Sequence, residues 1–177
     1  MGKEIKSAMT DPFPSPTDQL EVERLLYREA YCLDTRDWQG WLCCYADDAT
    51  YWIPAWATET ELTTDPEVEL ALMYMPDKTG LDDRVYRIMS RDSYASTPMP
   101  RSCHVVGNVL VLDGSADAMT VAASWTVHLY HMHKGARVHG GRYEYRLERR
   151  DGSLKIAAKK VVFLNDKVDV PLDVYNV

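Results

Sequence analysis

Near the start of the chain, apolar residues recur at helical spacing. The repeating set is Val22, Leu25, Leu26, Ala30 and Leu33. This period predicts a helix over about residues 16–33. Ser15 can cap that helix, Pro16 suits its first position, and Asp18 lies at the positive end of the helix dipole.

Two further helices are predicted by the same criterion. A short one starts at Asp37, where Trp38, Trp41, Leu42 and Tyr45 can share one face and Gly40 weakens the helix. A second covers residues 80–90, with Leu81, Val85, Ile88 and Met89 apolar.

Alternation with a period of two predicts strands in most of the remaining chain. Residues 49–53 form one strand, which Pro54 ends, and residues 67–74 form another despite their glutamates. Long strands follow over 101–112 and 119–132, and Lys134-Gly135 and Asp151-Gly152 supply two hairpin turns. The closing segment again alternates, at Val168, Val170, Leu172 and Val174.

The helices therefore come first and a long, mostly antiparallel sheet follows, which is typical of an α+β fold. Strands with one apolar face need a cover, and the first helices are the available one. We expect a curled, mixed sheet wrapped around a helix, a cone. Residues 1–14 are polar and contain proline, so we expect a flexible N-terminal arm followed by a single domain over residues 15–177.

Net charge and apolar content limit the classes of partner that this chain can bind. The net charge of −7 disfavours nucleic acid, which carries phosphates of the same sign. No segment is apolar enough to span a bilayer, and the N-terminus lacks the apolar stretch of a signal peptide, so we expect a cytoplasmic protein and no membrane partner. The four cysteines would then stay reduced, with Cys32, Cys43 and Cys44 acting as small core residues.

Candidate metal sites are weak. His131 and His133 lie on one face of a predicted strand, but a metal needs three or four converging ligands. Cys103 and His104 are adjacent and cannot easily face one ion. The spaced Cys and His pairs of an iron–sulfur centre do not occur. We therefore expect no metal and no cofactor bound by this chain.

Four carboxylates lie near an aromatic cluster, where a raised pKa can create a general acid or base: Asp34, Asp37, Asp47 and Asp48. The simpler interpretation is that Asp37 caps a helix and Asp47-Asp48 form a turn. We favour the simpler one and expect no catalytic residue in this chain.

Several longer stretches carry a resemblance. They are Leu26 to Ala30, Asp37-Trp38, Trp41-Leu42, Tyr45 to Ala49, Trp52 to Trp56, Gly80 to Val85, Lys159 to Val162 and Asp173 to Tyr175. Together they resemble the small (beta) subunit of aromatic-ring-hydroxylating dioxygenases, of the benzoate, toluate and anthranilate type, over nearly all of residues 20–177.

The resemblance implies the nuclear transport factor 2-like cone fold and a hetero-hexamer of three large and three small subunits. In such complexes the large subunit holds a Rieske iron–sulfur cluster and a mononuclear iron, and a reductase delivers electrons from NADH. The reaction adds both atoms of O₂ to an aromatic ring, giving a cis-dihydrodiol in aromatic catabolism. No catalytic residue belongs to the small subunit, whose role is structural.

Six residues of these stretches and of the C-terminal segment are candidates for the assembly interface: Trp52, Trp56, Arg84, Leu172, Val174 and Tyr175. Because chain ends fray unless they are tied down, the apolar end of the chain suggests docking, either on its own sheet or on a neighbouring subunit.

Two alternatives remain open at this point. The cone fold also houses stand-alone isomerases and dehydratases with an internal pocket, which would here use Asp34 or Asp47 with Tyr51 or His104. Bulky side chains that could fill the cone count against this: Trp38, Trp41, Trp52 and Trp125. The third interpretation is a homo-oligomeric binding module.

Overall fold

The computed structural model describes residues 14–90, 98–165 and 171–177. The helices are α1 (Pro16–Thr35), α2 (Trp38–Leu42) and α3 (Lys78–Met89). The strands are β1 (Tyr45–Pro54), β2 (Ala71–Met75), β3 (Arg101–Gly114), β4 (Ala118–His131), β5 (Gly135–Arg150) and β6 (Ser153–Phe163). A 3-10 turn, η2 (Val174–Asn176), follows near the C-terminus.

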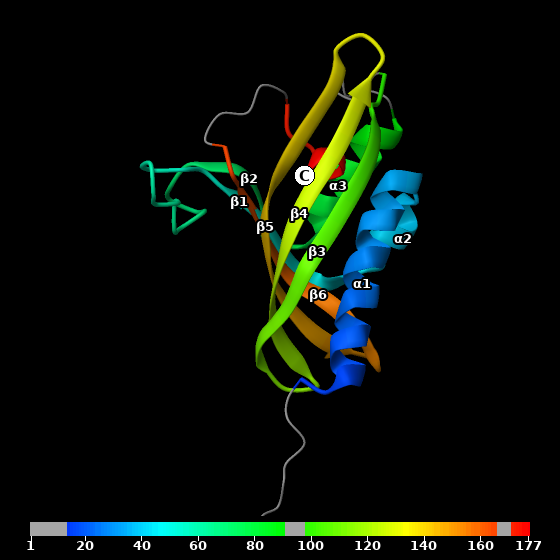
Figure 1. Ribbon diagram of the computed structural model, residues 1–177, viewed down its shortest axis with the longest axis vertical. Coiled ribbons are helices and arrows are strands. Elements are labelled where there is room, and N and C mark those ends of the chain that lie inside the picture. The colour runs from blue at the N-terminus through cyan, green and yellow to red at the C-terminus, as the bar shows by residue number, and fades with distance from the viewer. Residues whose placement is uncertain (1–13, 91–97, 166–170) are drawn as a thin grey trace, which may run out of the picture.

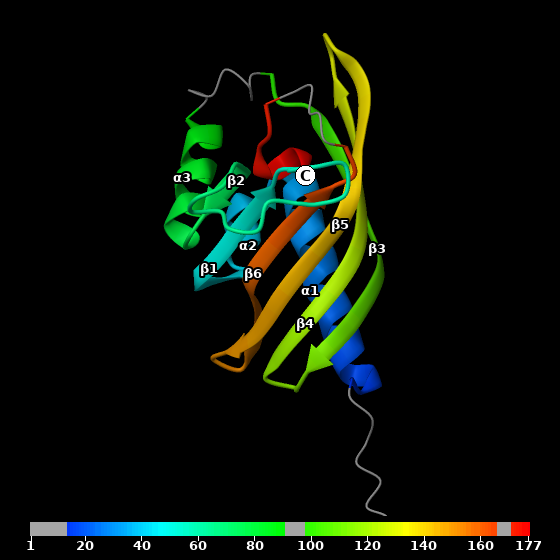
Figure 2. The same ribbon diagram turned by 90° about the vertical axis from the view of Figure 1, so that its left-hand side faces the viewer.

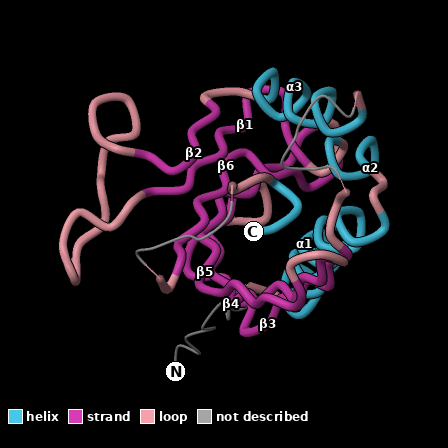
Figure 3. Tube along the Cα trace, turned by 90° about the horizontal axis from the view of Figure 1, so that it is seen from above, coloured by secondary structure: helices cyan, strands magenta, loops and turns pink. Residues whose placement is uncertain are grey.

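The strands form one strongly curved sheet in the order β2-β1-β6-β5-β4-β3 (Figure 1). Strands β1 and β6 run parallel, and every other neighbouring pair is antiparallel. Seen from above, the strands describe an arc, the helices close its open side, and the C-terminal segment lies between the two (Figure 3). The predicted α+β architecture, helices packed in a curled and mostly antiparallel sheet, is confirmed.

Helix α1 begins and ends where side chains and backbone satisfy its free groups. The Ser15 hydroxyl accepts a hydrogen bond from the Asp18 N–H, and the Asp18 carboxylate accepts one from the Ser15 N–H. At the other end Arg36 adopts a left-handed conformation, with φ of 59°, and returns its N–H to the helix. The Asp37 side chain then accepts from the Gly40 N–H and starts α2, so the predicted cap is confirmed.

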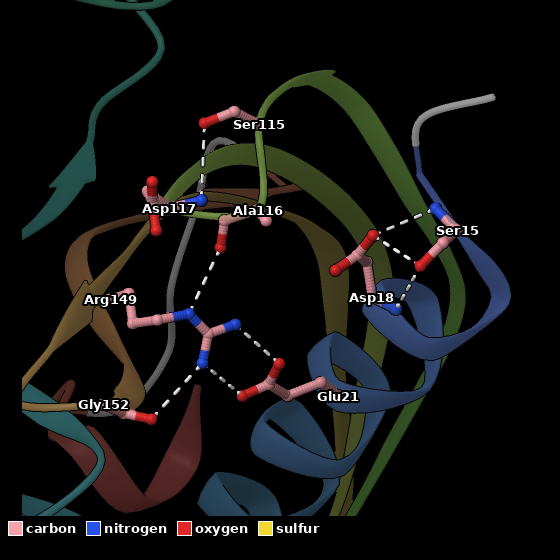
Figure 4. A network of polar contacts seen from close by, with 8 residues as sticks. All are labelled: Ser15, Asp18, Glu21, Ser115, Ala116, Asp117, Arg149 and Gly152. Atoms are coloured by element: carbon pink, nitrogen blue, oxygen red, sulfur yellow. Dashed lines mark hydrogen bonds and ion pairs between the residues drawn. The ribbon is translucent and has the colours of Figure 1, made fainter. Parts of the chain in front are cut away.

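At the end of the sheet that carries the β3–β4 and β5–β6 turns, one arginine joins the first helix to both turns (Figure 4). The two guanidinium nitrogens Nη1 and Nη2 of Arg149 donate to the carboxylate of Glu21 on α1, at 2.9 and 2.8 Å. The same guanidinium also donates to the carbonyls of Ala116 and Gly152. This bidentate contact fixes the start of α1 against the sheet.

The helices cover the concave face of the sheet (Figure 2), and the core side chains come from both layers. Along β4 every second side chain from Met119 to Leu129 is buried, as a strand with one covered face requires. Trp41 and Trp125 are core residues, as predicted, and Trp38 packs against the core while partly exposed. Trp52 is different. Because it follows the inward Tyr51 on β1, its side chain lies on the outer face of the sheet, so the prediction that it fills the cone is wrong.

The predicted strand over 67–74 is wrong in its first half. Residues 66–68 form a turn and β2 begins only at Ala71. The Glu69 carboxylate accepts from the Thr64 and Asp65 N–H groups, and the Asp65 carboxylate accepts from the Glu67 N–H. These local side-chain bonds compete with strand pairing. In addition, β1 starts at Tyr45, which the sequence placed on a helical face.

The predicted alternation at the C-terminus is also wrong where the structure describes it, because Val174–Asn176 is a 3-10 turn. The Asp173 carboxylate accepts from the Val174 N–H, and the Asn176 side-chain oxygen accepts from the Asp173 N–H. This capping pair closes a turn instead of extending the chain. Val168 and Val170 lie outside the described residues.

The predicted division into an N-terminal arm and a single domain over residues 15–177 stays a prediction. Residues 1–13 of the expected arm also lie outside the described part of the chain. Over the ranges given above, no helix is both long and apolar enough to cross a membrane.

Candidate functional site

The clearest pair of ionisable side chains on the inner face joins the end of α1 to β3. The Nδ1–H of His104 donates to the Asp34 carboxylate at 2.6 Å. The Asp34 carboxylate also accepts from the backbone N–H of His104 and from the Ser102 hydroxyl, both at 2.8 Å. The His104 side chain is only 1 % exposed and that of Asp34 is 21 % exposed. Sequence analysis named these two residues together, and the structure brings them into contact.

Two opposed effects set the charge of Asp34. Burial favours the neutral acid, but the hydrogen bonds from the His104 ring, the His104 N–H and Ser102 favour the carboxylate, so the pKa of Asp34 lies below its usual value. An ionised carboxylate only accepts hydrogen bonds, so the proton between the two residues belongs to His104 Nδ1. In neutral His104 the other ring nitrogen, Nε2, is then a free acceptor.

Replacing Asp34 with asparagine is expected to lower the free energy of unfolding at neutral pH by about 1–3 kcal/mol, because partly buried donors lose a charged acceptor. The folded-state pKa of Asp34 is depressed, so its contribution is complete above the unfolded pKa of about 3.9 and is lost as the pH falls through the folded value. The difference between native and variant should therefore shrink below about pH 4.

Urea unfolding of the full chain at several pH values measures this. The matched control is Asp48→Asn, because the Asp48 side chain is 67 % exposed and pairs with Arg150 at the surface. Equal losses in the two variants, or a difference that does not change with pH, would contradict the role given to Asp34.

A second buried pair was missed by sequence analysis. Lys159 on β6 donates to the Glu29 carboxylate of α1 at 2.6 Å, and both side chains are 2 % exposed. The hydroxyls of Tyr45 and Tyr145 donate to the same carboxylate. The available signal was the position of Glu29, three residues after Leu26 and four before Leu33, which places a charge on the apolar face of the helix.

The other three carboxylates cap a helix or form ion pairs with basic side chains. Asp37 caps α2, whereas Asp47 and Asp48 lie in β1, so the predicted turn at these two residues is wrong. The register of β1 against β6 shifts between Tyr45 and Thr50, and this irregularity leaves both carboxylates exposed. Asp47 accepts from Lys78 at 3.1 Å. Tyr51, the other residue of the isomerase interpretation, is buried on the inner face.

The histidines at the β4–β5 turn do not gather other ligands. His131 ends β4 and His133 lies in the turn, with ring centroids 5.8 Å apart. Among the described residues there is no group of three or more His, Cys, Asp or Glu side chains that could hold a metal ion.

The cysteines differ from one another. Cys32 and Cys44 are buried, as predicted, and burial raises the pKa of Cys44 to about 12, which keeps it a protonated thiol. Cys43 is exposed at the end of α2, so its prediction as a core residue is wrong. Cys43 directly precedes the buried Cys44, and adjacent positions at a helix end face different directions.

The six interface candidates contact different parts of the chain. Trp56 Nε1 donates to the Phe163 carbonyl at 3.0 Å, and a nitrogen of Arg84 lies 3.8 Å from the Asp173 carboxylate. On the outer face, Lys160 Nζ lies 5.0 Å from the ring centroid of Trp52. Leu172 packs against the core, in which Val174 and Tyr175 are buried. Their part in assembly stays a prediction.

Known proteins resemble this chain over most of its length. The family model described as "Ring hydroxylating beta subunit" matches residues 28–170. The benzoate 1,2-dioxygenase subunit beta of Acinetobacter baylyi is 34 % identical over 157 residues, which cover 89 % of this chain and 92 % of that protein. The 2-halobenzoate 1,2-dioxygenase small subunit of Burkholderia cepacia is 37 % identical over 89 % of this chain and 95 % of its own length.

A solved structure agrees with these sequences. The beta subunit of the benzoate 1,2-dioxygenase from Burkholderia mallei superposes with a TM-score of 0.74 at 32 % identity, covering 89 % of this chain and 96 % of that one. The nuclear transport factor 2-like fold expected from the sequence is thereby confirmed. Sequence and structure therefore agree that the chain belongs to the beta, or small, subunits of the aromatic-ring-hydroxylating dioxygenases.

Proposed function

We propose that this chain is the small subunit of the terminal oxygenase of a benzoate-type dioxygenase, and that its role is to hold the complex together. The observation that carries the proposal is the match, at 34–37 % identity and over nearly the whole chain, to small subunits whose names specify benzoate, 2-halobenzoate and toluate. An aromatic carboxylate is accordingly the substrate class that we infer for the complex.

The chemistry would take place in the large subunit. That subunit would hold the Rieske cluster and the mononuclear iron, and a reductase would supply two electrons from NADH. Both atoms of O₂ would enter the ring, giving a cis-dihydrodiol. We further propose an assembly of three large and three small subunits in the cytoplasm. No side chain of this chain is assigned to the reaction.

Co-expression with the large subunit tests the proposal. The large subunit should be encoded beside this chain and carry the Cys-x-His and Cys-x-x-His spacing of a Rieske centre. The two chains are expected to elute together, with a mass by light scattering that equals three of each, and to oxidise benzoate when the reductase is added.

The isolated small subunit, purified from iron-replete cells, is expected to be colourless and to contain iron well below one equivalent per chain. The reason is that its described residues offer no converging set of ligands. Metal analysis and electron paramagnetic resonance measure this. Stoichiometric iron or a Rieske-type signal in the isolated subunit would contradict the assignment of the metal centres to the partner.

A further inference from the structure

Three polar atoms on the inner face of the sheet have no hydrogen-bond partner among the described residues. They are the hydroxyl of Tyr51, Nε2 of His104 and Nε1 of Trp125. Tyr51 is 1 % exposed and Trp125 is 3 % exposed, and the His104 side chain is equally buried. A buried polar atom without a partner costs about 1–3 kcal/mol, and native proteins contain few of them. Each of the three atoms can therefore form a hydrogen bond with a molecule from outside the chain.

Two of these side chains, Tyr51 and Trp125, lie near Tyr143. The ring of Trp125 stacks on Tyr143 at 5.1 Å between centroids, with 8° between the planes. Lys159 Nζ lies 4.0 Å from the Tyr143 centroid and 5.8 Å from the Tyr51 centroid. Lys159 on β6 therefore lies near the rings of both Tyr51 and Tyr143. Trp125 on β4 lies against the ring of Tyr143.

His104 reaches the same region from β3. It pairs with Val127, and Val127 is two residues from Trp125 on the same face of β4. Such diagonal neighbours have Cα atoms about 7–8 Å apart, within reach of aromatic side chains. The C-terminal segment lies inside the arc of the strands (Figure 3), where His139 Nδ1 donates to the Asn176 carbonyl at 2.8 Å. This segment helps to close the interior from solvent.

The other two unpartnered indole nitrogens do not belong to this group. Trp52 lies on the outer face of β1, next to Lys160. Trp41 belongs to α2, and its ring meets the edge of Tyr45 at 5.0 Å.

The chemistry of the three atoms selects the ligand. Trp125 Nε1 can only donate, and the Tyr51 hydroxyl stays protonated because burial raises its pKa well above the usual value. His104 Nε2 is an acceptor in the neutral ring that carries its proton on Nδ1, the tautomer that donates to Asp34. Two donors and one acceptor among aromatic rings match one hydroxyl group on an aromatic ring.

An anion would fit poorly. Glu29 and Lys159 already neutralise each other, and Asp34 adds a negative charge next to His104. The carboxylate that we infer for the substrate of the complex is therefore disfavoured at this position by charge.

We propose that the interior of the cone is a binding site for a small neutral aromatic alcohol of the phenol class. Its oxygen accepts from Tyr51 and Trp125, its hydroxyl donates to His104 Nε2, and its ring lies beside Trp125 and Tyr143. This site is separate from the oxygenation that we assign to the large subunit and does not depend on that assignment.

Calorimetric titration of the full-length chain with phenol tests the site, and toluene, which replaces the hydroxyl by a methyl group, is the matched ligand. We expect one phenol per chain and binding at least about tenfold weaker for toluene, because toluene leaves the three polar atoms unpaired. Binding should also shift the indole ¹H–¹⁵N resonance of Trp125, assigned with Trp125→Phe.

Two variants each remove one polar atom. Tyr51→Phe removes only the hydroxyl, and His104→Asn keeps a donor toward Asp34 while removing the Nε2 position. Each is expected to weaken phenol binding roughly 3- to 10-fold without changing the affinity for toluene. Trp52→Phe, on the outer face, is the control and should leave both affinities unchanged.

Equal affinity for phenol and toluene would overturn the proposal, as would unaltered phenol binding in Tyr51→Phe. The absence of any phenol binding to the native chain would also overturn it. If His104→Asn fails to fold, Tyr51→Phe alone decides, because it removes one hydroxyl group and leaves the ring packing in place.

Discussion

Lys159→Met is expected to lower the free energy of unfolding of this chain by about 3–5 kcal/mol, the usual cost of removing one partner of a buried ion pair. The variant leaves the Glu29 carboxylate, buried on α1, without its cation. Burial lowers the pKa of Lys159, and the contact with Glu29 acts in the opposite direction. The charged form of Lys159 is therefore stabilised mainly by Glu29. The nearby ring of Tyr143 adds a cation–π contact, which is also lost.

Urea unfolding followed by circular dichroism measures the effect. Lys160→Met is the matched control, because Lys160 is the next residue on β6 but faces outward and its side chain is 28 % exposed. The double variant Glu29→Gln with Lys159→Met should recover most of the loss, since the amide oxygen can accept from one of the two tyrosine hydroxyls and the amide N–H can donate to the other. Similar losses for Lys159→Met and Lys160→Met would show that the buried pair contributes little.

Hydrophobic periodicity predicted the helix and the hairpins whose formation depends on residues close together in the sequence. Helix α1 and the hairpins β4–β5 and β5–β6 follow from apolar spacing and from turn residues such as Asp151-Gly152, and both signals act within a few residues. Two of the errors occur where side chains bond the adjacent backbone. Glu69 and Asp173 each close a turn in a segment whose apolar residues alternate as in a strand.

The interior polar groups could be foreseen only in part. Asp34 and His104 were named as one possible pair, but their contact depends on how α1 lies against β3, 70 residues later in the chain. Glu29 and Lys159 are 130 residues apart, and only the register of β6 brings them together. Single-residue patterns carry no information on such registers. The sequence could therefore locate a charge on an apolar face without naming its partner.

Removing residues 174–177 is expected to lower the free energy of unfolding by on the order of 5 kcal/mol, a large part of the roughly 5–15 kcal/mol typical of a domain. Val174 and Val177 are 0 % exposed and Tyr175 is 3 % exposed, so three apolar side chains leave the core. Each contributes about 1.5–3 kcal/mol when fully buried. His139 also loses the Asn176 carbonyl as its acceptor. The end of the chain thus docks on its own sheet, one of the two possibilities that its apolar residues suggested.

The measurement is thermal unfolding of the full chain and of the truncated one, together with light scattering after co-expression with the large subunit. Val174→Ala and Val138→Ala form a matched pair, because Val174 is fully buried while Val138 is 55 % exposed on β5. Val174→Ala should cost about 1–3 kcal/mol and Val138→Ala close to nothing.

If Val174 and Tyr175 also serve assembly, they must do so through the shape of the cone that they fill, because their side chains are already buried within this chain. A truncated chain with an unchanged melting temperature would contradict the docking. A truncated chain that is destabilised but still binds the large subunit fully would separate folding from assembly and remove both residues from the interface.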